Sequence, residues 1–114
     1  MTATVDGNAW VASNFSGANI SGTLQIEGAA SDGSQITLGI PASSKTGSFA
    51  AGGTNPYQAT YQSGVTYWRL ITGTFKITSI GSNAVSGTFS GSFTNTTTNA
   101  TMNISGGVFT SSYQ

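Results

Sequence analysis

The stretch from Gly73 to Phe93 reads GTFKITSIGSNAVSGTFSGSF and decides the fold class. Apolar and polar residues alternate on both sides of Gly81-Ser82-Asn83, and alternation with a period of two is typical of strands that bury one face. A three-residue loop with Asn83 in the left-handed conformation would set Phe75 opposite Phe89 on the buried face. The stretch therefore predicts an antiparallel β-hairpin.

The residues before this hairpin predict a second one, which turns at Ser63-Gly64. A two-residue turn there pairs Ala59 with Trp68 and sends alternate side chains to opposite faces. The predicted core face carries Tyr57, Tyr61, Trp68 and Leu70. The predicted solvent-exposed face offers a possible interaction surface formed by Gln58, Tyr67 and Arg69.

The residues after it extend the sheet, because a loop over Asn95–Ala100 sets Phe93 opposite Met102 and completes a C-terminal meander. The same alternation recurs along the chain, and no window has apolar residues at helical spacing for three turns. We expect strands near residues 3–12, 22–28, 35–41, 46–51, 57–62, 65–71, 73–80, 84–93 and 101–110. This spacing predicts a single all-β domain over residues 1–114, an antiparallel β-sandwich or flattened barrel of about eight to nine strands.

The charge content is unusually low. Charged residues make up 5% of the chain, against about a quarter in an ordinary soluble domain. Three acids balance three bases, so the net charge is zero and no basic stripe is available to neutralise phosphates. No apolar run approaches the roughly 18 residues of a membrane span. We therefore expect no nucleic-acid partner and no membrane insertion.

The residues that most often carry catalysis are missing from the sequence. The chain has no His and no Cys, which excludes Ser-His and Cys-His nucleophile systems and thiolate metal ligands. Asp6 and Asp32 each precede a glycine, where short acids normally serve the backbone of a turn. We therefore expect a protein that is not an enzyme and has no cofactor and no metal. A hydrolase that uses the acids is an alternative, which two carboxylates converging in one pocket would favour.

Short motifs of strand and turn residues follow one order along nearly the whole chain. They are Val5-Asp6-Gly7-x-x-Trp10, Ile36-Thr37-Leu38, Gly73-Thr74-Phe75-Lys76-Ile77-Thr78, Ser86-Gly87-Thr88-Phe89 and Ile104-x-x-Gly107-x-Phe109. In this order they resemble an uncharacterised family of small β-rich lipoprotein domains exported by Bacteroidota. The resemblance implies export to the periplasm or outer surface behind a lipid anchor, and it supplies no activity and no catalytic residues. We expect an extracellular or cell-surface location. The chain differs from the family pattern in its very low charge and in having no cysteine to carry a lipid.

An exported β-domain with so little charge is expected to act through its surface. Hydroxyl and amide side chains supply little electrostatic repulsion between copies, and an edge strand without charges can pair with a neighbour. We expect a non-catalytic domain that makes structural or adhesive contacts, with copies of itself as partners. The predicted assembly strand runs from Ala3 to Ala12, with Val5 and Trp10 as its apolar anchors.

A carbohydrate-binding module of a surface lipoprotein is the alternative, with a surface glycan as its partner. Exposed aromatic rings on a β-face would favour this function, because they can stack on sugar rings. In the predicted register, Tyr67 is the solvent-exposed aromatic residue of its hairpin and lies beside Arg69. Trp10 is more typical of a core anchor. An exposed aromatic row, if the fold forms one, would therefore decide between the two functions.

Overall fold

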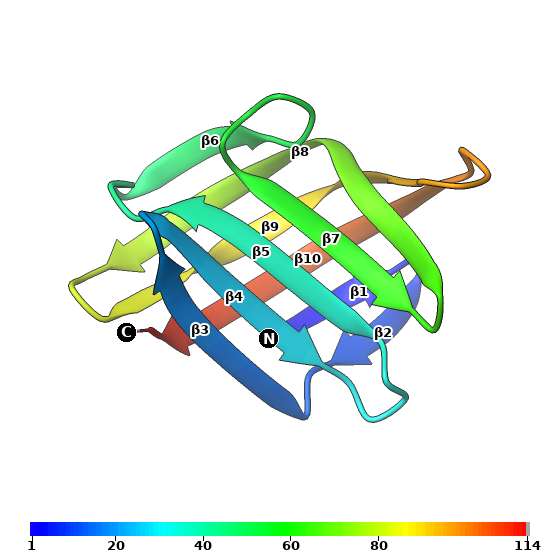
Figure 1. Cartoon of the computed structure of the whole chain (residues 1–114), viewed down its shortest axis with the longest axis horizontal. Helices are drawn as coiled ribbons and strands as arrows, with labels where there is room; N and C mark the ends of the chain where they lie inside the picture. Colours follow the sequence, from blue (N-terminus) through cyan, green and yellow to red (C-terminus); the bar gives the residue numbers. More distant parts are fainter. Residues whose placement is uncertain (114) are drawn as a thin grey trace.

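The computed structural model describes residues 1–113. The chain forms antiparallel strands that are joined by turns (Figure 1). The strands are β1 (Thr2–Val5), β2 (Asn8–Val11), β3 (Asn14–Ile20), β4 (Thr23–Ala29), β5 (Gln35–Pro41), β6 (Gly47–Ala51), β7 (Gln58–Ser63), β8 (Thr66–Ile80), β9 (Ala84–Asn95) and β10 (Thr101–Ser112). No helix occurs in the described residues, and the predicted all-β class is confirmed.

Hydrogen bonding orders the strands as β2-β1-β10-β9-β8-β7-β5-β4-β3, and β6 pairs with the second half of β8. Figure 1 shows the sheet curling into a half-barrel, in which β3, β4, β5 and β7 cross in front of β8, β9 and β10. The curl brings β3 against the end of β10, where a Cβ atom added to Gly17 would collide with the carbonyl oxygen of Ser112. This curled antiparallel sheet confirms the expected fold class of a β-sandwich or flattened barrel, and its form is that of a half-barrel.

The core lies inside the curl, where the inward side chains of each strand are buried. A row of aromatic rings crosses it. The centroid separations are 4.7 Å for Phe49 and Tyr57, 5.9 Å for Tyr57 and Phe75, 6.2 Å for Phe75 and Phe89, and 6.3 Å for Phe89 and Phe109. Separations in this range are favourable for aromatic pairs. The row therefore holds β6, β8, β9 and β10 together through side-chain packing as well as hydrogen bonds.

The hairpin of β8 and β9 has the predicted pairing with a different turn. Phe75 lies opposite Phe89, as expected. Asn83 is not left-handed, however, and Gly81 N–H donates to the Ala84 carbonyl across a tighter turn. The extra residue lies instead in a bulge of β8 between Ile77 and Ser79. Such a bulge shifts the register by one residue, so it gives the same pairing of Phe75 with Phe89 as the predicted three-residue loop.

The hairpin of β7 and β8 has the predicted faces and a corrected register. Ser63 pairs with Thr66, so the turn consists of Gly64 and Val65, and Tyr61 instead of Ala59 lies opposite Trp68. Gly64 has a φ of 61°, a conformation that glycine adopts without steric cost. The correction moves the pairing by two residues, and two is the side-chain period of a strand, so every side chain stays on its predicted face.

The amino-terminal prediction of one strand over residues 3–12 is wrong. Asp6 and Gly7 both have positive φ values, 50° and 86°, and their turn folds the segment into the hairpin of β1 and β2. Val5 and Trp10 both point into the core and are buried. Strand β3 was not predicted, because its sequence NFSGANI lacks a regular alternation. The expected strands 65–71 and 73–80 are one bent strand, β8, with an irregularity between Leu70 and Thr72.

Candidate functional site

Three of the β-turns meet at one end of the half-barrel, on the right in Figure 1. They connect β1 to β2, β4 to β5 and β7 to β8. A hollow of about 430 Å³ opens between them, and we call it the mouth pocket. It is lined by Val5, Asp6, Asn8, Ala9, Trp10, Asp32, Tyr61, Ser63, Thr66, Trp68 and Met102. Binding residues commonly lie on turns that a rigid sheet positions, so this pocket is the candidate site.

The floor of the mouth pocket is aromatic. Tyr61 and Trp68 lie directly opposite each other on β7 and β8, and both are only partly buried. Trp10 reaches the pocket from β2 and is 6% exposed. The expectation that Trp10 anchors the core is therefore confirmed, whereas Tyr61 and Trp68 are less buried than predicted. The chain has two tryptophans, and both line this pocket.

A chain of hydrogen bonds connects Trp10 to the rim. Its indole Nε1–H donates to Ser34 Oγ at 2.8 Å. The Ser34 hydroxyl donates in turn to Asp32 Oδ1 at 2.5 Å, and the Ser34 backbone N–H donates to the same oxygen at 2.9 Å. These two hydrogen bonds lower the pKa of Asp32 below its ordinary value of 3.8. Asp32 therefore presents an ionised carboxylate to the pocket at neutral pH.

Replacing Ser34 with Ala is expected to lower the free energy of unfolding by about 1 to 2 kcal/mol, because the buried indole N–H of Trp10 loses its acceptor. The pKa of Asp32 should rise toward 3.8 at the same time, since the hydroxyl bond to its carboxylate is lost. Urea denaturation and an NMR titration of the Asp32 carboxyl measure the two effects. An unchanged stability would show that water replaces the lost acceptor.

The same hydrogen bonds give stability a defined pH dependence. The folded-state pKa of Asp32 is lowered, so the stabilisation from its ionised form is fully present above pH 3.8. It is lost as the pH falls through the folded-state value. Acid unfolding of the Ser34→Ala variant should therefore show a smaller decline over this range.

The pocket brings together two acids that lie far apart in the sequence. Asp6 and Asp32 occupy different turns, and both line the mouth pocket. The turn at Asp32-Gly33 agrees with the prediction, whereas Asp6 was expected within a strand over residues 3–12. Asn8 adds an amide to the same rim. The turn chemistry of the acids could be predicted from sequence. That the two turns share one end of the molecule could not, because it depends on how the sheet curls.

The predicted interaction surface lies outside this pocket. Gln58 and Arg69 both donate to the carbonyl of Gly53, at 3.0 and 3.2 Å, and so hold the loop after β6. Tyr67, the third predicted residue, is 49% exposed and lies opposite Gln62. The structure thus brings Gln58 and Arg69 together in a loop contact, and Tyr67 lies two residues from Arg69 on the same face of β8.

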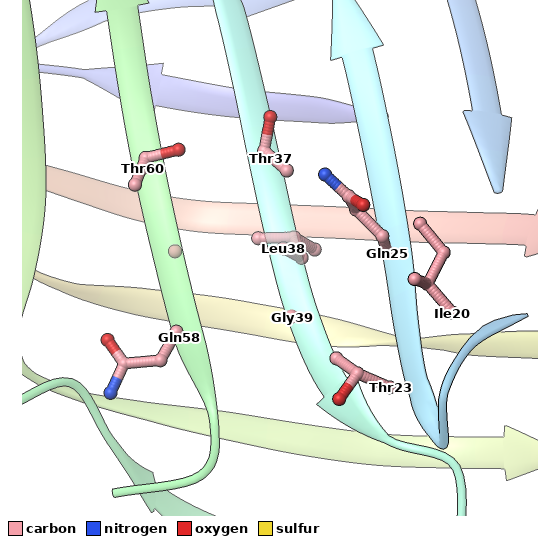
Figure 2. A pocket seen from close by; sticks show the side chains of 9 residues that line it. Ile20, Thr23, Gln25, Thr37, Leu38, Gly39, Gln58 and Thr60 are labelled. Atoms are coloured by element: carbon pink, nitrogen blue, oxygen red, sulfur yellow. The ribbon is translucent and has the colours of Figure 1, made fainter. Parts of the chain in front are cut away.

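A second hollow, of about 280 Å³, lies on the outer face of β4, β5 and β7 (Figure 2). Gly39 is at its centre, with Gln25 and Gln58 directly opposite on the neighbouring strands. Gly39 is not left-handed, and a Cβ atom there would come no closer than 3.9 Å to any other group. The fold does not require this glycine. The hollow carries no charged lining residue and no aromatic ring, so it is a weaker candidate than the mouth pocket.

Within residues 1–113, no group of three or more Asp, Glu, His or Cys side chains is placed to hold a metal ion. No helix in this part of the chain is long and apolar enough to cross a membrane.

Comparison with curated proteins and with solved structures finds no match. A family model does match, over residues 1–112 and therefore over nearly the whole chain, and its description is "Domain of unknown function (DUF6252)". The chain belongs to this family, DUF6252.

Proposed function

We propose that this protein is a non-catalytic adhesive domain that binds neutral carbohydrate in its mouth pocket. One observation carries the proposal: partly exposed aromatic rings, two carboxylates and an amide line the same hollow. Of the two functions that the sequence suggested, glycan binding has the better geometric support. Contact with a surface glycan is also one form of the adhesive role.

The chemistry of the lining suits a sugar. The rings of Tyr61 and Trp68 offer flat apolar surfaces for the C–H face of a pyranose. Carboxylates accept hydrogen bonds, so Asp6 and Asp32 can each receive sugar hydroxyls, and an amide such as that of Asn8 can both donate and accept. Lys and Arg are not among the lining residues. The pocket should therefore prefer neutral sugars to uronic acids, whose charge the two aspartates would repel.

A glycoside hydrolase is the rival that the paired acids raise. Its mechanism needs one carboxyl group that stays protonated near neutral pH to act as the general acid. The hydrogen bonds from Ser34 lower the pKa of Asp32, which favours the opposite protonation state. Asp32 is therefore better suited to accept a hydrogen bond than to act as the general acid, and we assign Asp32 to binding.

Location belongs to the same proposal. The motif order that resembles exported lipoprotein domains of Bacteroidota supports a position at the cell surface or outside it, where glycans occur. The scarcity of charge, 5% of residues, also fits a domain that meets neutral polysaccharide. In the cell, the domain would attach the protein or cell surface that bears it to a surface glycan.

Tryptophan fluorescence provides a direct test, because both tryptophans line the pocket. The chain is titrated with a panel of neutral oligosaccharides, namely gluco-, manno-, galacto- and xylo-oligosaccharides, and with oligogalacturonate. At least one neutral oligosaccharide should change the emission, and oligogalacturonate should bind more weakly. The double variant Asp6→Asn/Asp32→Asn should lower the affinity by about tenfold or more, as expected when two hydrogen bonds to charged groups are weakened.

The matched control is Glu27→Gln, which neutralises an acid on the outer face of β4 and should leave the affinity unchanged. Two results would contradict the proposal. One is an emission spectrum that no neutral oligosaccharide alters at millimolar concentration. The other is cleavage of a bound oligosaccharide, detected by mass spectrometry, that is lost in the double variant, since this would identify a hydrolase.

A further inference from the structure

Strand β3 (Asn14–Ile20) is an open edge of the sheet. It is last in the strand order and forms backbone pairs only with β4, and the end of β10 packs against it at Gly17 without pairing. At seven residues it is longer than the other strands with an open edge, β2 with four and β6 with five. An unpaired edge presents a row of backbone N–H and C=O groups that can pair with another strand. The longest such row in the described residues belongs to β3.

The edge also lacks the features that normally prevent pairing. Proteins protect open edges with charged side chains, proline or inward-pointing charges. The sequence of β3, NFSGANI, contains no charged residue and no proline. It exposes two large apolar side chains, Phe15 at 59% and Ile20 at 54%. Contact with a second strand would cover part of both.

The strand is complementary to itself in one antiparallel register. A two-fold axis through Gly17 pairs Ser16 with Ala18 of a second copy and overlaps all seven residues. Axes through Ser16 or Ala18 would overlap only five. An axis between two residues would place outward side chains opposite inward ones, which the side-chain period of two forbids. Full overlap therefore selects the axis at Gly17.

We propose that two copies of this chain associate by antiparallel pairing of β3 with β3 about Gly17, which joins two half-barrels into one continuous sheet. The partner is a second copy because the register is self-complementary and the chain has no net charge to keep copies apart. This contact replaces the assembly strand expected over residues 3–12. Val5 and Trp10 of that segment point into the core and cannot anchor a partner.

The proposal is independent of glycan binding, and opposing charges test it by sedimentation velocity. Ser16→Lys/Ala18→Lys places lysines opposite each other across the axis and should weaken the dimer by about tenfold or more, since like charges directly opposite are unfavourable. Ser16→Lys/Ala18→Glu differs only at position 18 and makes the same pair attractive, so the dimer should return and become sensitive to salt. The wild-type dimer should not respond to salt.

Two measurements keep the test decisive. Ser90→Lys/Thr110→Lys adds the same two charges at exposed positions of β9 and β10, away from the edge, and should dimerise like the wild type. The natural chain has no cysteine, so mixed Ser16→Cys and Ala18→Cys variants should form a disulfide-linked heterodimer across the predicted pair. The proposal is overturned if the wild-type chain stays monomeric at a concentration of about 1 mM, because any dimer would then be weaker than typical specific complexes. The proposal is also overturned if the Ser16→Cys and Ala18→Cys mixture gives no more disulfide-linked heterodimer than a mixture of Ser90→Cys and Ala18→Cys.

Discussion

Replacing Phe75 with Ala should lower the free energy of unfolding by about 3 to 5 kcal/mol, which is the usual cost of deleting a buried phenyl ring. Phe75 has no exposed surface and lies in the middle of the aromatic row, between Tyr57 and Phe89. Loss of the Phe75 ring leaves a cavity between β6, β8 and β9. Urea denaturation followed by circular dichroism measures the change.

Phe15→Ala is the matched control, because it removes the same ring from a position that is 59% exposed. In solution dilute enough to dissociate the proposed dimer, the free energy of unfolding of this variant should fall by less than about 1 kcal/mol. Equal losses for the two variants would mean that the aromatic row does not form the centre of the core.

Gly91→Ala should strongly destabilise the protein although it adds only a single methyl group. Gly91 of β9 lies opposite Gly73 of β8. A Cβ atom at Gly91 would lie 2.4 Å from Leu70 Cδ1, 2.5 Å from the carbonyl oxygen of Thr72 and 2.9 Å from the Cα of Gly73. Two of these three atoms belong to the backbone and cannot rotate away. We expect a loss of about 3 kcal/mol, the upper range for overpacking.

Gly39→Ala is the control for that experiment and should have the opposite sign. Gly39 also lies within a strand, but a Cβ atom there meets nothing within 3.9 Å. Removing glycine from such a position restricts the unfolded chain and should stabilise the protein by about 0.4 to 1 kcal/mol. Thermal unfolding of both variants decides the question. A stable Gly91→Ala variant would show that β8 and β9 are farther apart at this point.

Residue alternation in the sequence by itself determines a large part of this fold. It predicted the all-β class, the pairing of Phe75 with Phe89 and the faces of Tyr61, Trp68 and Tyr67. These properties are local, because a side-chain period of two assigns each residue to a face wherever the strand lies. Turn chemistry was local as well, and the Asp32-Gly33 turn lies where it was expected.

Register and edges depended on the tertiary structure. The bulge after Ile77 could not be distinguished from a longer loop by sequence, since both accommodate one extra residue. Strand β3 has no alternation to reveal it, because most of its residues are exposed and only Gly17 and Ala18 are partly buried. Its backbone pairing with β4, and not a buried side-chain face, makes it a strand.

The candidate site also depended on the tertiary structure. The sequence identified Asp32 as a turn residue and Trp10 as typical of a core anchor, and it placed Asp6 at an Asp-Gly step within an expected strand. It did not indicate that they meet, because the distance between turns depends on how far the sheet curls and which strands become neighbours. The curl puts the turns of three hairpins at one end and leaves Tyr61 and Trp68 partly uncovered between them. Local patterning therefore determined the strands and their faces, whereas the long-range closure of the sheet decided which polar and aromatic groups share a pocket.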